Sequence, residues 1–395
     1  MAYFDWNATA PMLAEAQAAL LDGCGRLWAN PSTPYRSGAR VRLALDAARA
    51  TVAARFGVTP GRVVFTSGAT ESANGLLRAA ALRAGADGEA WISAVEHPCV
   101  GKTVHACFGP QRVRVIPVGA DGRADADWIR DQLKRNRPAL VAVMAASNVT
   151  GVLQPWREIL ALCREAGAPF FCDAVQWIGK ESGADPATGP DPAWAECAGV
   201  GFSAHKLGGP KGVGCLIAGD EWTGLAIQTG GSQEQGMRAG TENVPGILAM
   251  VAALEHRLTH LPTPAQRAAR DAFEARLQAE WPGQVQVHGA AAPRLWNTSL
   301  LALPTHRAAR WIARLDRLGY AVSSGSACAS SREGPASMLE PMGVGAEAAA
   351  RTLRISAGWE TAPEDWQGLA GALLQAGREL DREAPDSGPG RVIEI

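Results

Sequence analysis

Short runs of apolar residues without polar alternation constrain the fold of this chain most strongly. They lie before residue 219, at 62–66, 90–95, 112–118, 139–146, 169–172, 200–203 and 213–218. Strands that are apolar throughout are buried on both faces, as in a mostly parallel sheet between two layers of helices. Helical patterns are predicted around and between these runs, at 13–20, 41–56, 72–83, 127–135, 157–166 and 193–198. The first part of the chain is therefore predicted to be of the α/β class.

The pattern restarts after a proline-rich segment, Leu261-Pro262-Thr263-Pro264, which is the predicted hinge. A long helix is predicted before it, at 244–259. After it we predict a helix from 265, strands at 284–288, 297–302 and 320–323, a helix at 305–318, and a closing strand and helix. A chain of 395 residues exceeds the usual size of one core. We therefore expect a large domain at 12–260 and a smaller α+β domain formed by 1–11 and 261–395.

The composition is that of an ordinary globular protein, with 47% hydrophobic and 19% charged residues. The formal net charge is −1 without a basic run, which favours neither nucleic acid nor an anionic membrane as a partner. Because no signal peptide or membrane span is predicted, we expect a cytoplasmic protein. The 8 cysteines are scattered without metal-ligand spacing, so we expect no metal site and mostly reduced thiols.

Lysine is rare in this chain, with 5 lysines against 33 arginines. Lys206 follows a predicted strand, in the stretch Gly201-Phe-Ser-Ala-His-Lys-Leu-Gly-Gly-Pro-Lys-Gly-Val-Gly214. An amine can lose its proton, unlike a guanidinium, and only the neutral amine forms a Schiff base with an aldehyde. Lys206 is therefore a candidate for such a bond. A glycine-rich turn with solvated lysines is the structural alternative.

Polar side chains follow the ends of several predicted strands, which is where sheets of this class bind ligands. A cofactor with an aldehyde, a ring nitrogen and a phosphate needs a lysine, a carboxylate, a flat group against the ring and a phosphate cradle. Lys206, Asp173, His97 and the turn at 67–71 meet these needs in that order. The other predicted cofactor contacts are Ala69 and Thr70 of that turn, Asn148, Gln176, Ser203 and His205. Each residue alone also suits a cap, a loop or a core position, but together they favour pyridoxal 5'-phosphate.

Several motifs, in the same order, resemble the cysteine desulfurases of the class V aminotransferase superfamily, of the nitrogen-fixation and iron-sulfur type. The matching segments are Tyr3-Phe-Asp-Trp-Asn-Ala-Thr9, Thr66-Ser-Gly-Ala-Thr-Glu-Ser72, Glu96-His97, Asp173-Ala-Val-Gln176 and Ser203-Ala-His-Lys206. The resemblance covers nearly the whole chain. It implies a fold-type I pyridoxal-phosphate enzyme with a mostly parallel seven-stranded sheet in its large domain. It also implies a homodimer in which Thr241, in a segment similar to the family's Gly-Met-Arg-Ser-Gly-Thr-x-Asn, reaches the phosphate of the neighbouring subunit.

Cys328 lies in a run of small residues, Ser323-Ser-Gly-Ser-Ala-Cys-Ala-Ser-Ser331, which resembles the mobile catalytic loop of the first desulfurase group. Small neighbours let such a loop move and expose a thiolate, the nucleophile that a substrate sulfur requires. The structural alternative is a buried cysteine, which the absence of apolar neighbours in the sequence disfavours.

The resemblance also implies the reaction, which converts L-cysteine to L-alanine. Arg354 and Asn148 bind the substrate, and the planar fork of the arginine suits its carboxylate. Lys206 removes the α-proton, His97 stacks on the cofactor ring, and Cys328 takes the sulfur as a persulfide. An acceptor protein then collects the sulfur for iron-sulfur cluster or other thio-cofactor synthesis.

Three positions depart from the family pattern. Tyr35 replaces a usual histidine, Val149 replaces an acid, and Gly358-Trp359-Glu360 replaces Gly-Arg-x. They leave the partner, substrate access and turnover open. A selenocysteine lyase, or another class V lyase or aminotransferase in which Cys328 is incidental, is the alternative enzyme. A catalytically idle relative that only binds a partner of sulfur metabolism is the alternative from another class.

Overall fold

The computed structural model describes residues 1–181, 190–324 and 338–383, and its centre is a seven-stranded sheet. The strands are β2 (Val63–Thr66), β3 (Ala90–Ser93), β4 (Val113–Ile116), β5 (Leu140–Ala142), β6 (Phe170–Asp173), β7 (Gly199–Ser203) and β8 (Gly214–Ala218). Their spatial order is β2-β8-β7-β6-β5-β3-β4. The strands from β7 to β4 pair in parallel, and β8 is antiparallel to both β7 and β2. The predicted seven-stranded, mostly parallel sheet is confirmed.

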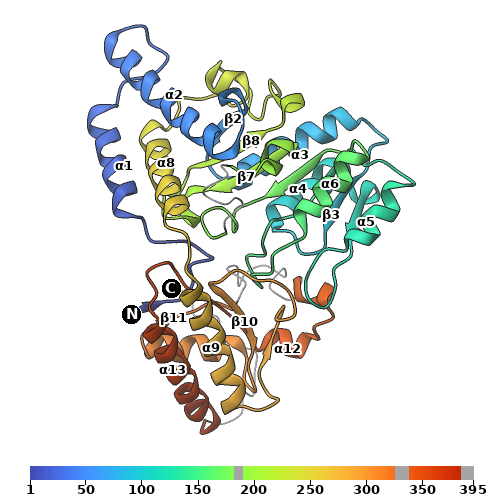
Figure 1. Ribbon diagram of the computed structural model, residues 1–395, viewed down its shortest axis with the longest axis vertical. Helices are drawn as coiled ribbons and strands as arrows, with labels where there is room; N and C mark the ends of the chain where they lie inside the picture. Colours follow the sequence, from blue (N-terminus) through green and yellow to red (C-terminus); the bar gives the residue numbers. More distant parts are fainter. Residues whose placement is uncertain (182–189, 325–337, 384–395) are drawn as a thin grey trace.

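Helices cover both faces of the sheet, as the uniformly apolar strands require (Figure 1). One face packs against α1 (Ala14–Arg26), α2 (Arg36–Phe56), α5 (Ala126–Leu133), α6 (Trp156–Glu165), α7 (Ala193–Glu196) and α8 (Val244–Thr259). The other packs against α3 (Ala69–Ala84) and α4 (Pro98–Phe108). Neighbouring strand residues alternate between these layers: Trp91 faces the first and Ile92 the second.

Helices α4 and α1 are among those that differ from the sequence prediction. Helix α4 was not predicted, although His97 caps its first turn and Pro98 occupies the first helical position, because Gly101 and its β-branched residues have low helix propensity. Helix α1 runs past its predicted end at residue 20 to Arg26. Gly23 lets α1 pack closely against α8, since a Cβ at this position would lie 2.8 Å from the Cα of Pro245 on α8.

A second hydrophobic core forms around the three-stranded antiparallel sheet β12-β10-β9 (Figure 1). Its elements are β9 (Gln286–Val287), β10 (Thr298–Ala302), β12 (Thr352–Ser356), α9 (Pro264–Glu280), α10 (Ala308–Arg317) and α13 (Pro363–Asp381), with the short α12 (Ala346–Ala350) nearby. The chain start joins this core, because β1 (Ala2–Tyr3) pairs in parallel with β11 (Tyr320–Ala321) and Phe4 is buried in it. We propose that the two cores correspond to domains 12–260 and 1–11 with 261–395.

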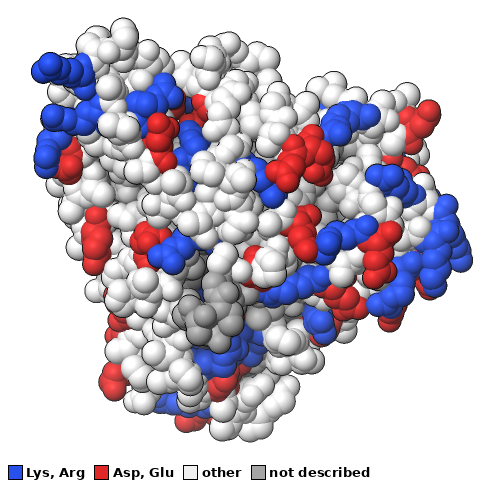
Figure 2. Space-filling model, turned by 45° about the horizontal axis from the view of Figure 1, so that its top comes forward, with Lys and Arg blue, Asp and Glu red and all other residues white. Residues whose placement is uncertain are grey.

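The surface mixes both signs of charge. Acidic and basic side chains are interspersed over much of the face in Figure 2, and many form pairs such as Arg114 with Glu89 at 3.0 Å. In the part of the chain that the structure describes, no helix combines the length and apolar character that crossing a bilayer would need.

The loop after β8 is fixed to the edge of the main sheet by a buried ion pair. Glu234 accepts hydrogen bonds from both terminal nitrogens of Arg49, each at 2.7 Å, and from the amide of Phe65 on edge strand β2 at 2.8 Å. Glu234 and Gln235 have φ values of 48° and 58°, a left-handed conformation that strains residues other than glycine. The ion pair thus offsets the strain of the turn.

The variant Glu234→Gln should lower the free energy of unfolding by about 3 kcal/mol, because it leaves Arg49 buried without its counter-charge. Urea unfolding followed by tryptophan fluorescence measures the change. The matched control is Glu255→Gln, which breaks the bidentate ion pair of Glu255 with Arg55. In this pair the Glu255 side chain is 35% exposed and the Arg55 side chain 41% exposed. That loss should not exceed about 1 kcal/mol. Equal losses in the two variants would contradict the assignment.

Candidate active site

A cavity of about 270 Å³ opens beyond the carboxyl ends of the parallel strands. It is lined by Ala69, Thr70, His97, Cys99, Met144, Ala146, Asn148, Asp173, Val175, Gln176, Ser203, His205 and Lys206. Asp173 ends β6 and Ser203 ends β7, while His97 and Asn148 follow β3 and β5. The cavity thus brings together every predicted cofactor contact except Thr241, which is exposed in the loop at 228–243.

One wall of the cavity is the start of helix α3. The helix begins at Ala69 without a side-chain cap, and the amide of Ala69 donates to the hydroxyl of Ser203 at 2.8 Å. Strand β8 passes directly behind this turn, because a Cβ on Gly214 would lie only 2.5 Å from the Cα of Gly68. Such a helix start, with its amides and positive dipole end, suits an anion such as phosphate.

Asp173 is buried and His97 is half-buried in the lining of the cavity. Asp173 accepts from the amide of Val175 at 3.0 Å, and burial raises the pKa of its carboxyl, which the nearby His97 opposes. The Nδ1 of His97 accepts from the amide of Cys99 at 3.2 Å, so the proton of the neutral ring lies on Nε2. Burial lowers the pKa of His97, which favours a neutral ring. Burial also raises the pKa of Cys99, so this thiol is a poor nucleophile.

Lys206 lies in a 3-10 turn directly after β7. Its Nζ donates to the backbone carbonyls of Asn7 and Ala8, each at 2.7 Å. Burial lowers the pKa of Lys206 to about 8, and the positive charge of Arg354 acts in the same direction. The amine therefore reaches its neutral, nucleophilic form close to physiological pH.

The N-terminal segment contributes to the site in a way that the sequence analysis did not assign. The backbone carbonyl of Asn7 accepts hydrogen bonds from the Nζ of Lys206 and from the side-chain Nε2 of Gln176. The side-chain oxygen of Asn7 accepts from the Nζ of Lys180 at 2.8 Å. The available signal was the presence of Asp5 and Asn7 in an otherwise apolar lead. Cys99 was also missed, although it lies two residues after His97.

Arg354 lies on β12 beside the cavity and is 2% exposed. Its Nη2 pairs with Asp5 at 2.5 Å, and its Nη1 donates to the carbonyl of Asn148 at 3.2 Å. Its backbone bonds to Ser323 in both directions, so the segment that leads to Cys328 starts beside it. Cys328 itself lies outside the described residues.

The cavity has an unsatisfied acceptor. The side-chain oxygen of Asn148 is buried and has no hydrogen-bond partner among the described residues. A buried acceptor of this kind is costly unless a ligand donates to it. The described residues contain no His, Cys, Asp and Glu cluster that could hold a metal ion. An amine, a carboxylate, an imidazole and a helix start suit an organic cofactor with a phosphate instead.

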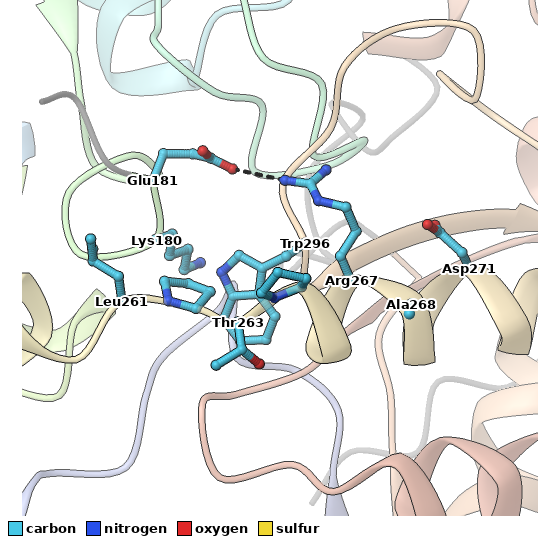
Figure 3. Close-up of a pocket in the computed structure, with 10 residues that line it drawn as sticks. Lys180, Glu181, Leu261, Thr263, Arg267, Ala268, Asp271 and Trp296 are labelled. Atoms are coloured by element: carbon cyan, nitrogen blue, oxygen red, sulfur yellow. Dashed lines mark hydrogen bonds and ion pairs between the residues drawn. The ribbon is translucent and has the colours of Figure 1, made fainter. Parts of the chain in front are cut away.

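A second cavity, of about 410 Å³, lies at the predicted hinge and contains none of the predicted site residues (Figure 3). Its lining residues include Lys180, Leu261, Thr263 and Trp296 (Figure 3). Glu181 and Arg267 form an ion pair of 3.4 Å across it. Its charged groups are thus already engaged within the protein.

Comparisons with known proteins agree with this geometry. The family model for class V aminotransferases matches residues 2–369. A cysteine desulfurase from Enterobacter agglomerans is 36% identical over 363 residues, which cover 90% of this chain and 87% of the relative. The structure of a NifS-like protein from Rickettsia africae has a TM-score of 0.80 at 27% identity and covers 96% of this chain and 99% of that one. A structure of SspA in complex with cysteine has a TM-score of 0.76 at 26% identity, covering 90% and 98%. The chain therefore belongs to the class V aminotransferase family and, within it, to the cysteine desulfurases.

Proposed function

We propose that this protein converts L-cysteine to L-alanine with pyridoxal 5'-phosphate and transfers the sulfur through a persulfide on Cys328 to an acceptor protein. The observation that supports this most is the convergence of Lys206, Asp173 and His97 with the start of α3 in one cavity. The relatives named cysteine desulfurases, and the relative solved with cysteine, support the same substrate.

The residues of the cavity fit pyridoxal phosphate. Lys206 would hold the aldehyde, Asp173 would pair with the ring nitrogen, and His97 would lie against the ring. Asn148 and Gln176 would bind the ring hydroxyl, while Ala69, Thr70, Ser203, His205 and the partner subunit's Thr241 would bind the phosphate. When bound, the cofactor draws electrons away from the α-carbon of the substrate.

Lys206 is suited to moving the α-proton, because a pKa of about 8 lets its amine accept and return a proton near neutral pH. The carbonyls of Asn7 and Ala8 hold its Nζ in place. His205 stays neutral, since burial lowers its pKa to about 4. Its Nδ1 lies 3.1 Å from the hydroxyl of Thr9.

Arg354 is the proposed site for the substrate carboxylate. It is buried and paired with Asp5 while its Nε has no partner among the described residues, so the guanidinium retains a donor for a second carboxylate. The adjacent Ser323 starts the segment that carries Cys328. This arrangement supports attack by the Cys328 thiolate on the sulfur of a substrate held by Arg354.

The variant Cys328→Ala should lose alanine formation from L-cysteine by at least about a hundredfold, because no other group replaces the nucleophile. The control is Cys24→Ala, which removes an exposed free thiol on α1 and should retain activity. Mass spectrometry of the wild type after one turnover should find one extra sulfur atom on the peptide that contains Cys328. Full activity of Cys328→Ala would refute the persulfide role.

Capture of pyridoxal phosphate by the apoprotein should depend on the ionisation of Lys206. Only the neutral amine reacts, so the capture rate should rise about tenfold per pH unit and level off near pH 8. The variant Arg354→Gln should move this inflection to higher pH, because Arg354 lowers the pKa of Lys206. Stopped-flow absorbance measures the rate. An inflection that stays in place, or moves to lower pH, would contradict the assigned electrostatics.

A homodimer is the proposed assembly. Large apolar side chains are exposed on α1, on α2 and on the segment between them: Leu21 at 65%, Trp28 at 76%, Tyr35 at 52% and Leu43 at 70%. Exposed apolar side chains concentrated on neighbouring elements are typical of an interface. The exposed Thr241 would then reach the partner's cavity.

The variant Trp28→Glu should give a monomeric mass by light scattering and weaker binding of pyridoxal phosphate, because a charge enters the apolar interface and Thr241 is withdrawn from the partner. The control Leu82→Glu changes a side chain on α3 that is 84% exposed, and this variant should stay dimeric. A monomeric wild type, or a dimeric Trp28→Glu, would contradict the proposed interface.

A further inference from the structure

Trp359 departs from the family pattern, which has an arginine at this position, and the proposed reaction gives neither Trp359 nor the next residue, Glu360, a role. Both meet Arg257, which lies in the last turn of α8 and is 2% exposed. The guanidinium carbon of Arg257 is 3.8 Å from the centre of the Trp359 ring, and its Nη2 donates to the carboxylate of Glu360 at 3.2 Å. One arginine of the main core therefore contacts Trp359 and the residue that follows it.

The same arginine also reaches the lysine turn. The Nε of Arg257 donates at 3.2 Å to the carbonyl of Leu207, the residue after Lys206. Gly179 makes room for it, since a Cβ there would lie 3.0 Å from the Cβ of Arg257, and Gly208 lies beside its Nη2, at a distance of 3.5 Å from an added Cβ. Both have positive φ, 79° and 94°, which other residues rarely adopt. The Arg257 side chain thus packs against the backbone at Gly179 and at Gly208.

Trp359 is held on its remaining sides by Trp6, by Trp296 and by helix α9. Its ring meets Trp6 and Trp296 edge to face, with centroids 6.0 and 5.8 Å apart, and its carbonyl accepts from Gln266 of α9 at 2.8 Å. Gly358 packs so tightly on Trp6 that a Cβ would lie 1.9 Å from the indole. Figure 3 shows Trp296 in the hinge cavity, which Thr263 also lines. Trp359 is therefore fixed to both the chain start and the hinge.

We propose that the contact of Arg257 with Trp359 and Glu360 positions Lys206 relative to Arg354. Arg257 contacts the residue next to Lys206, and Trp359 follows the strand that holds Arg354. This inference rests on the proposed function, in which a single small substrate meets both groups. A desolvated cation over an indole ring is a strong and directional contact, so it fixes the separation of the Lys206 amine from the Arg354 guanidinium.

Loosening this contact should weaken substrate binding and slow turnover, because Arg354 binds the substrate carboxylate and Lys206 moves the α-proton. In Trp359→Leu, the KM for L-cysteine should rise at least about tenfold, and kcat should fall as well. Trp359→Phe keeps an aromatic face for Arg257, and its KM should return to within about threefold of the wild type. The matched control is Trp281→Leu, which alters a half-buried tryptophan of the same core, in edge-to-face contact with Trp311 at 6.0 Å. Its KM should stay unchanged. An unchanged KM in Trp359→Leu, or an equal rise in Trp281→Leu, would overturn the proposal.

Hydrogen exchange separates this inference from the proposed function. In the purified full-length protein without cysteine, amides at 204–208 and 352–356 should exchange faster in Trp359→Leu than in the wild type, and Trp281→Leu should match the wild type there. If the wild type forms no alanine from L-cysteine, the proposed function is wrong, and the exchange rates alone then test the positioning role of Trp359. Faster exchange in Trp359→Leu only would support the positioning role, and equal exchange in the two variants would overturn it.

Discussion

The hydrogen bonds from Lys206 to the carbonyls of Asn7 and Ala8 connect the two cores of the molecule at its candidate active site. Lys206 follows a strand of the main sheet, whereas the chain start pairs with β11 and buries Phe4 in the second core. The amine is therefore held where both cores meet, and the same burial lowers its pKa to about 8. Burial where the two cores meet therefore both positions the Lys206 amine and makes it reactive near neutral pH.

Around this amine the interior is unusually polar. Glu96 is buried, its pKa is raised to about 8 by burial, and it accepts from Ser93 and from the amide of Met144. Lys180 is also buried, and burial lowers its pKa while its amine bonds to Asn7 and Gln176. Such groups destabilise a core unless they are paired, so their concentration at the strand ends indicates a site kept for chemistry.

The sequence predicted the main sheet well, because uniformly apolar runs have few alternatives to a sheet covered by helices on both faces. It also predicted most residues of the cavity, because these residues lie at or just after the carboxyl ends of those strands. Helix α4 was missed because the packing of Val100 and Phe108 against the sheet outweighs weak local propensity. The contact between Arg257 and Trp359 was not predictable, since a pair so distant along the chain leaves no local pattern. The role of Cys328 stays a prediction from the sequence, because Cys328 lies outside the described residues.

Lys206 is the proposed covalent attachment point of the cofactor. Borohydride reduction of the protein loaded with pyridoxal phosphate fixes the carbon–nitrogen bond, and peptide mass spectrometry then locates the adduct among the 5 lysines of the chain. One adduct is expected, on Lys206, in a cavity that also contains Asp173 and His97. An adduct on any other lysine, or no adduct at all, would contradict this assignment.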